Sequence, residues 1–316
     1  MATLAATDVD LSVELSADPA RPLRLPNPIA TASGCFASGR EIDRFFDIAD
    51  LGAVVVKSLT LEPRLGLPTP RMVETDAGML NAIGLQNPGI DAWIATDLPW
   101  LASRGVRTIV SIAGSTVSEY RALAERLRGQ PGVVAIEANI SCPNVEDRNT
   151  IFACREETTA EVLTQVMRVS SVPVLAKLTP DVTDIAAIAE AAHGAGASGV
   201  SLINTLSGMA IDVETGRPRL GGVTGGLSGP AIKPVAVRAI HQVHRRVPGL
   251  PILGMGGVRT VEDVVELVMA GASGVAVGTA TFGNPFAPLE LLEALPDWLA
   301  ARGHRSVAAL RGSVAA

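Results

Sequence analysis

The chain has 316 residues, 47% of them hydrophobic, and a formal net charge of −6. This length allows one large core, so residues 1–316 are expected to form a single domain, with about 1–20 as a variable N-terminal extension. The acidic balance contains no basic block, which argues against a nucleic acid or an anionic membrane as partner and favours a small-molecule ligand.

The start of the chain is not expected to be a targeting signal. Residues 1–20 lack the positive and apolar segments of a signal peptide, and no apolar run is long enough to cross a membrane, so a cytoplasmic protein is expected. Residues 13–16 and 23–25 flank Asp18-Pro19 and predict a β-hairpin that closes one end of the fold.

Short segments rich in Val, Ile and Ala then alternate with helix-like stretches. Eight of them are typical of parallel strands buried on both faces: 28–33, 53–59, 107–114, 135–141, 174–180, 199–205, 252–257 and 274–280. Thr116 with Glu119, and Thr260 with Asp263, predict capping boxes at two helix starts. A βα unit repeated eight times predicts a (β/α)₈ TIM barrel, an α/β fold whose active site lies at the carboxyl ends of its strands.

Two connections are too long for simple turns. Residues 60–105 follow the second strand and residues 206–229 follow the sixth. Long ordered connections on a compact domain usually cover or build a site, so these are expected to be active-site loops.

Polar residues gather where the predicted strands end, as a barrel active site requires. The strand ends carry Ser33, Lys57, Ser58, Ser111, Asn139, Cys142, Lys177, Thr179, Asn204 and Thr205. Buried lysine and asparagine are costly unless they are paired, so a binding site explains them best. The two lysines are each expected to meet an anion, either a ligand group or, alternatively, an internal carboxylate such as Glu137 or Asp181.

Glycines follow the last two strands. Gly256, Gly257 and Gly278 would let the backbone approach a phosphate, although the first two could instead simply make a tight turn. The amides Asn81, Asn139, Asn144 and Asn204 could be satisfied core groups, but together they offer the donors and acceptors that a flat heterocycle requires.

Cys142 follows the fourth strand and precedes Pro143, which places a thiol on a loop over the site, where a thiolate could remove a proton from a substrate carbon. Cys35 and Cys154 are expected to be structural. No histidine lies at a strand end and no Cys-x-x-Cys pair occurs, so neither a metal site nor a Ser-His-Asp triad is expected.

Several longer motifs stand in a fixed order along the chain: 32–36 (ASGCF), 81–89 (NAIGLQNPG), 139–145 (NISCPNV), 177–180 (KLTP), 203–205 (INT) and 254–258 (GMGGV). They resemble the dihydroorotate dehydrogenases over about residues 23–284, and the similarity is closest to the NAD-linked class 1B branch. Ordered motifs of this length are far more specific than any one glycine pattern.

The resemblance implies oxidation of dihydroorotate to orotate in pyrimidine synthesis, with FMN as cofactor, Cys142 taking the C5 proton and the C6 hydride passing to the flavin. It implies FMN contacts from Ala32, Ser33, Lys57, Ser58, Asn139, Lys177, Ile203, Gly229, Gly256, Gly257, Gly278 and Thr279. For dihydroorotate or orotate it implies contacts from Lys57, Asn81, Ile83, Gly84, Leu85, Asn139, Asn144, Asn204 and Thr205.

Two positions depart from the family pattern. Ser111 stands where many class 1B members carry an asparagine that contacts FMN, and Ala153-Cys154 replaces a Phe-Gly-type step after Cys142. A contact from Ser111 and the details of the loop after Cys142, which is expected to move as a lid, are therefore open.

The electron acceptor lies beyond this chain. The chain has no cysteine set for an iron–sulfur cluster, and no dinucleotide-binding Gly-x-Gly-x-x-Gly turn leads from a predicted strand into a helix, since the one match, residues 194–199 (GAGASG), precedes a strand. The resemblance therefore implies a homodimer core with a second subunit carrying FAD and a [2Fe–2S] cluster, in a heterotetramer that reduces NAD. Direct transfer to fumarate, as in class 1A, is the alternative.

Two other functions remain open at this level. A related FMN barrel could act on dihydropyrimidines without a carboxylate, and a phosphate-binding barrel could be an isomerase or lyase without flavin, because fold does not determine function.

Overall fold

The computed structural model describes residues 4–140 and 152–315. Its centre is a sheet of eight parallel strands: β3 (Ile29–Thr31), β4 (Val54–Val55), β7 (Thr108–Ile112), β8 (Val133–Asn139), β9 (Val174–Lys177), β10 (Gly199–Leu202), β15 (Ile252–Met255) and β16 (Gly274–Val277). Their order is β3-β16-β15-β10-β9-β8-β7-β4, and a parallel bridge between Ala30 and Ala53 joins the two edge strands. The predicted (β/α)₈ barrel is confirmed, with strands shorter than the predicted segments.

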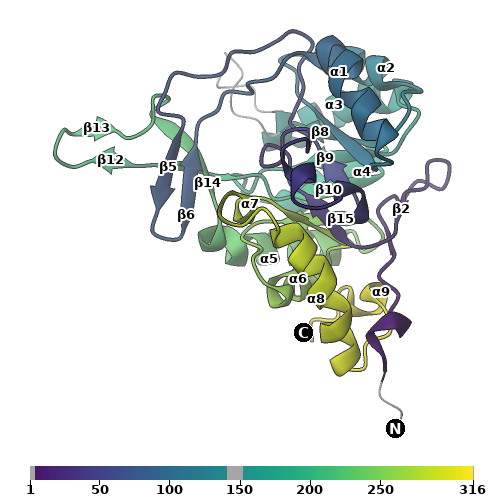
Figure 1. The fold of residues 1–316 in the computed structure, drawn as a ribbon. Coiled ribbons are helices and arrows are strands. Elements are labelled where there is room, and N and C mark those ends of the chain that lie inside the picture. Colours follow the sequence, from purple (N-terminus) through teal and green to yellow (C-terminus); the bar gives the residue numbers. More distant parts are fainter. Residues whose placement is uncertain (1–3, 141–151, 316) are drawn as a thin grey trace.

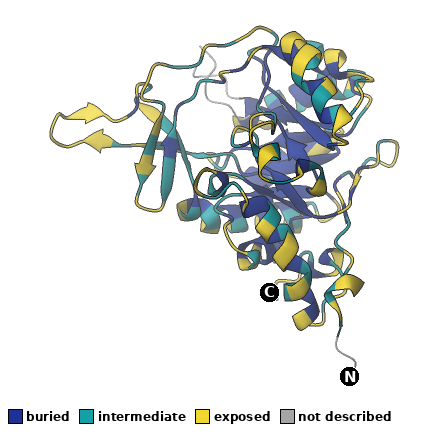
Figure 2. Cartoon of the chain, in the orientation of Figure 1, coloured by how far each residue is buried: buried dark blue, intermediate teal, exposed yellow. Residues whose placement is uncertain are grey.

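Helices surround this sheet (Figure 1). They are α1 (Ile90–Ser103), α2 (Val117–Leu127), α3 (Glu156–Val169), α4 (Ile185–Gly194), α5 (Lys233–Arg246), α6 (Val261–Ala270), α7 (Ala280–Gly283), α8 (Ala287–Ala301) and α9 (Val307–Leu310). Figure 2 shows their outer faces exposed and the barrel strands buried. The structure therefore places one continuous core between the strands and the inner faces of the helices.

The first strand connection differs from the predicted alternation. Between β3 and β4 the chain forms only the 3-10 turns η2 (Ile42–Arg44) and η3 (Ile48–Asp50). Gly39 adopts a φ of +88°, and a Cβ there would lie 2.6 Å from the Ile48 side chain. The chain thus folds back over a glycine to bury Ile48, and these short turns stand where the alternation predicted a helix.

One of the two predicted capping boxes forms. Thr260 accepts from the Asp263 backbone, and the Asp263 carboxylate accepts from the Thr260 N–H. At α2, Thr116 accepts from Glu119 N, but the Glu119 carboxylate accepts from Ser115 N instead of Thr116 N. That predicted box is wrong in its second bond, because the carboxylate reaches one residue further back along the chain.

The N-terminal hairpin forms as predicted. β1 (Val13–Glu14) pairs antiparallel with β2 (Arg24–Leu25), and Leu15 and Leu25 are fully buried. Ala17 N donates to Ser198 O at 2.7 Å, just before β10 begins. The hairpin therefore covers the amino-terminal end of the barrel, opposite the strand ends that carry the polar residues.

The two long connections join in one antiparallel sheet, which we call the wall sheet: β5 (Met72–Thr75), β6 (Gly78–Asn81), β11 (Leu206–Met209) and β14 (Thr224–Ser228) in the order β11-β14-β6-β5. The short strands β12 (Ile211–Asp212) and β13 (Arg217–Pro218) extend from it as a hairpin (Figure 1). Among the described residues, no helix is long and apolar enough to span a membrane.

Candidate active site

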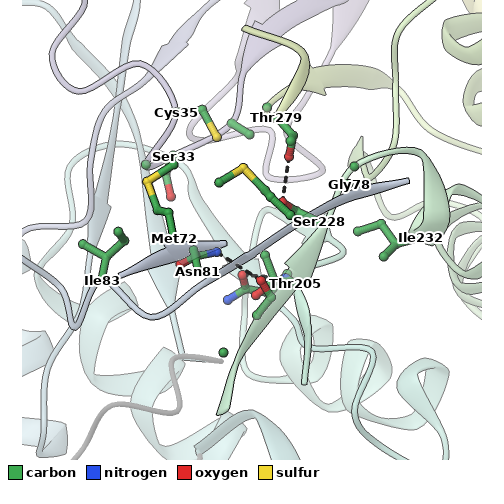
Figure 3. Close-up of a pocket in the computed structure, with 18 of the residues that line it drawn as sticks. Ser33, Cys35, Met72, Gly78, Asn81, Ile83, Thr205, Ser228, Ile232 and Thr279 are labelled. Carbon is green, nitrogen blue, oxygen red and sulfur yellow. Dashed lines mark hydrogen bonds between the residues drawn. The ribbon is translucent and has the colours of Figure 1, made fainter. Parts of the chain in front are cut away.

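A cavity of about 1520 Å³ lies between the carboxyl ends of the barrel strands and the wall sheet. Figure 3 shows Ser33, Cys35 and Thr279 from the barrel facing Asn81 and Ser228 from the wall sheet. A single-ligand pocket typically has roughly 300–1,000 Å³. The cavity therefore has room for a cofactor and a substrate together.

All predicted site residues that the structure describes line this cavity. From the barrel these are Ala32, Ser33, Lys57, Ser58, Asn139, Lys177, Ile203, Asn204, Thr205, Gly256, Gly257, Gly278 and Thr279, and from the long connections Asn81, Ile83, Gly84, Leu85 and Gly229. Cys142 and Asn144 lie outside the described residues, although Asn139 and Cys154, on either side of that segment, both line the cavity. The individual roles of these residues stay predictions.

A hydrogen-bonded row of side chains joins residues at the carboxyl ends of four barrel strands: β4, β7, β8 and β10. The Ser58 and Ser111 hydroxyls are 2.8 Å apart, Asn139 Nδ2 donates to Ser58 Oγ at 3.0 Å, and Asn204 Nδ2 donates to Asn139 Oδ1 at 3.5 Å. Tyr120 OH also donates to the Asn139 carbonyl at 2.8 Å. The two amides are therefore held in fixed orientations at the cavity wall. Ser111 is fully buried behind Ser58 and does not line the cavity.

The two lysines have different surroundings. Lys177 is 4% exposed, donates to Ser33 Oγ at 3.4 Å, and its Nζ lies 3.5 Å from Oε1 of the fully buried Glu137. Lys57 is half-buried, and its Nζ lies close to Gly34. Of the two anionic partners expected for Lys177, the internal carboxylate is present, because β8 and β9 are neighbours in register, and a ligand contact from Lys177 stays a prediction.

The glycines after β15 are needed for two reasons. Gly256 and Gly257 have φ of +131° and +75°, so they make the tight turn that was the simpler interpretation. A Cβ on Gly257 would also lie 2.7 Å from Lys233 Cβ and 3.0 Å from the Gly229 carbonyl. The turn therefore brings bare backbone to the cavity, a surface that suits a phosphate.

Sequence reasoning missed two contributors. Cys35, expected to be structural, lines the cavity, but burial raises the pKa of its thiol to about 11 despite Lys177 and Lys57 nearby. Ser228 on β14 accepts from Thr279 Oγ1 at 2.8 Å and also lines the cavity (Figure 3). The glycine-rich stretch 221–229 was the available signal for the second, since a chain so poor in side chains suits close packing against a ligand.

A closed (β/α)₈ barrel with a polar cavity at the carboxyl ends of its strands defines an α/β-barrel enzyme. Among the described residues, no three His, Cys, Asp or Glu side chains are placed to hold a metal ion. The family profile described as dihydroorotate dehydrogenase matches residues 20–299. The chain belongs to this family.

Similar proteins cover most of the chain. A protein of Geobacillus kaustophilus is 54% identical over 277 residues, 88% of each chain. One of Desulforudis audaxviator is 53% identical over 291 residues, 92% of this chain and 94% of the relative. One of Latilactobacillus sakei is 54% identical over 280 residues, 88% and 91%. All three are named dihydroorotate dehydrogenase B (NAD(+)), catalytic subunit.

Proposed function

We propose that this chain is the FMN-binding catalytic subunit of a class 1B dihydroorotate dehydrogenase, which oxidises dihydroorotate to orotate in pyrimidine synthesis. The observation that carries the proposal is the single cavity in which the described residues of six separate family-like motifs meet. The names of the similar proteins support the same reaction.

The cavity suits a flavin mononucleotide. The turn at Gly256 and Gly257 presents backbone without side chains at the cavity, which suits a phosphate. The amide of Asn139 and the hydroxyls of Ser58 and Ser33 suit a heterocycle with alternating donors and acceptors. FMN, when bound, supplies the acceptor for the hydride that leaves C6 of the substrate.

The substrate would lie beside the wall sheet. Asn81 Nδ2 donates to Gly226 O at 3.3 Å, and Thr205 N donates to the Asn204 side chain at 2.8 Å, so these groups are pre-positioned around one part of the cavity. Lys57 is the candidate cation for the substrate carboxylate. Replacing Lys57 by Ala should weaken both flavin and orotate binding, and unchanged orotate affinity would remove this assignment.

Cys142 is proposed as the base that takes the C5 proton. The two described cysteines are poor alternatives: burial raises the pKa of Cys35 to about 11, and burial together with Asp181 raises the pKa of Cys154, so both are thiols at neutral pH. An ordinary thiol has a pKa of about 8.5, so part of it is present as the thiolate base near neutral pH, whereas an unactivated hydroxyl is scarcely ionised there.

The test of the base compares Cys142→Ser with Cys154→Ser as control. Cys142→Ser should keep FMN and orotate but reduce flavin very slowly, whereas Cys154→Ser should stay near the parent rate. The parent rate should rise with pH as the thiolate forms. Parent rates in Cys142→Ser, or a flat profile across the thiol range, would exclude Cys142 as the base.

The same material tests the reaction. Anaerobic dihydroorotate should bleach the flavin of the purified chain, while dihydrouracil should not, because it lacks the carboxylate for Lys57. Bleaching by dihydrouracil instead would favour the related dihydropyrimidine enzymes. Protein that purifies without flavin absorbance and does not take up FMN would favour a flavin-free isomerase or lyase.

The electron acceptor and the assembly are proposed from the family resemblance. We expect one domain in residues 1–316, a homodimer core in the cytoplasm and a partner subunit with FAD and a [2Fe–2S] cluster that reduces NAD. The isolated chain should then reduce NAD only after the partner is added. NADH production by the chain alone, or oxidation of the bleached flavin by fumarate, would overturn the two-subunit proposal.

A further inference from the structure

Glu137 is a fully buried carboxylate beneath the cavity. It lies on β8 two residues before Asn139, so both side chains leave the same side of the strand. Asn139 lines the cavity and Glu137 does not, which places Glu137 one layer deeper in the barrel. A charge in such a place is costly unless it is compensated.

Its compensation comes from one cation at the cavity floor. Lys177 Nζ lies 3.5 Å from Glu137 Oε1, and within the described part of the chain neither carboxylate oxygen of Glu137 makes a hydrogen bond. Lys177 is the register partner of Asn139 on β9, and it lines the cavity. The pair thus has one member inside the barrel and one member facing the ligand space.

Stability alone does not account for this arrangement. The desolvation of two buried charges offsets most of their attraction, and apolar side chains of similar volume would often stabilise the barrel equally well. What the pair changes is the charge at the cavity floor: with Glu137 ionised, Lys177 adds almost no net charge there. Buried charges are screened little by salt. The negative charge of Glu137 therefore also offsets the attraction between Lys177 and a ligand that contacts it.

We propose that Glu137 is a positioning residue that holds the Lys177 ammonium group at the cavity floor and, by cancelling its charge, sets the reduction potential of the flavin. This inference rests on the proposed function, because it requires a redox cofactor in the cavity. Glu137 does not line the cavity, so it acts on a ligand there through Lys177. Reduction adds negative charge to the ring system, so an uncompensated Lys177 would favour the reduced form.

The experiment measures the midpoint potential of bound FMN in the full chain, anaerobically against a reference dye, together with the dissociation constant of oxidised FMN. Glu137→Gln keeps the shape and removes the charge. It should favour the reduced over the oxidised flavin by about tenfold, which is a rise of about 30 mV for a two-electron couple. Ser201→Ala is the matched control: Ser201 is buried, is in register with Lys177, and its hydroxyl makes no hydrogen bond to any residue that the structure describes, so its loss should leave the potential unchanged.

Two further variants complete a double-mutant cycle. Lys177→Gln leaves the Glu137 charge unbalanced and should lower the potential, and the double variant Glu137→Gln, Lys177→Gln should return close to the parent value. If Glu137→Gln does not fold, the rise from Lys177→Gln to the double variant measures the same effect. An unchanged potential in both comparisons would overturn the proposal, even if stability or FMN affinity falls. A parent chain that binds no FMN would instead refute the proposed function.

Discussion

The barrel and the wall sheet form opposite sides of the cavity, yet they are built on different physical grounds. Barrel strands such as β9, β10, β15 and β16 are buried along their whole length. In the wall sheet, β5 and β11 alternate between exposed and half-buried residues. The barrel is therefore held by side-chain packing on both faces, and the wall sheet by backbone pairing over a thin apolar layer.

Glycines show the close backbone pairing of the wall sheet most clearly. A Cβ on Gly78 would lie 2.0 Å from the Ser228 carbonyl, and one on Gly225 would lie 2.6 Å from the Asn81 carbonyl. Beneath the wall sheet, the buried apolar cluster is only Leu80, Ala82 and Leu220, with a few half-buried neighbours. A rigid barrel thus carries Lys57, Lys177, Asn139 and Asn204, while a close-packed but thinly buried wall carries Asn81 and Ser228 opposite them.

The largest difference should appear on truncating core leucines. Leu253 on β15 is fully buried in the barrel core, and Leu253→Ala should lower the free energy of unfolding by about 3–5 kcal/mol through lost burial and a residual cavity. Leu80→Ala in the wall sheet should lower the free energy of unfolding by about 2 kcal/mol or less, because the small cluster around Leu80 can close over the space left. Urea unfolding followed by circular dichroism measures both. Equal losses would mean that the wall sheet is packed as firmly as the barrel.

Gly226→Ala should weaken orotate binding more than it lowers the free energy of unfolding. Its Cβ would lie 2.0 Å from Thr205 Oγ1, so Thr205 must move away from its place at the cavity. We expect orotate affinity to fall by roughly tenfold to a hundredfold, which corresponds to about 1.4–2.7 kcal/mol, with FMN retained. Fluorescence titration measures this.

Gly249→Ala is the control, since a Cβ there meets nothing within 4 Å. Retained orotate affinity in Gly226→Ala would show that the wall yields easily and that the close contact with Thr205 does not position the substrate.

Asp263→Asn tests how much the cap of helix α6, on the barrel side, contributes to stability and how this contribution depends on pH. Burial alone would raise the pKa of Asp263, but hydrogen bonds from Lys233 and from two backbone N–H groups outweigh it, and the pKa lies below its ordinary value. A depressed acid stabilises the fold above its unfolded pKa of about 3.9 and loses this contribution as pH falls through the folded value. We expect a loss of about 1–2 kcal/mol at pH 7.

That loss should shrink toward pH 3, which urea unfolding at pH 7, 5 and 3 can follow. Glu266→Gln removes the other, more exposed carboxylate partner of Lys233 and should cost far less. A loss for Asp263→Asn that stays constant with pH would assign its effect to shape and not to charge.

The smallest effect should come from the hydrogen bond that links the two regions. Thr279→Val removes the 2.8 Å bond to Ser228 Oγ between the barrel and β14. We expect the free energy of FMN binding to weaken by about 0.5 kcal/mol, which corresponds to a roughly twofold higher dissociation constant. A double-mutant cycle with Ser228→Ala isolates the pair. Additive effects would show that barrel and wall bind the cofactor independently at this point.

Local patterns in the sequence were enough for the barrel. The eight strand segments, the N-terminal hairpin and the Thr260 capping box depend on residue periodicity and on neighbours a few positions apart, and all three appear in the structure. Most of the cavity lining at the strand ends could be predicted for a related reason: parallel strands place their carboxyl ends at one edge, so polar residues at those ends lie close together.

Contacts between distant segments could be decided only by the tertiary structure. Asn81 and Gly226 pair across 145 positions in the wall sheet, and no local pattern in two long connections specifies that register. The glycine turn that replaces the first helix depends on Ile48 packing over Gly39. Glu137 could be named as a possible partner of Lys177, but only the neighbouring register of β8 and β9 brings the two charges together. The sequence by itself determined which elements form and which of their ends carry chemistry, because those are short-range properties of the chain. Which charges and loops face one another was decided by the register of the barrel and wall-sheet strands, because strand pairing brings residues that are distant in the sequence into contact.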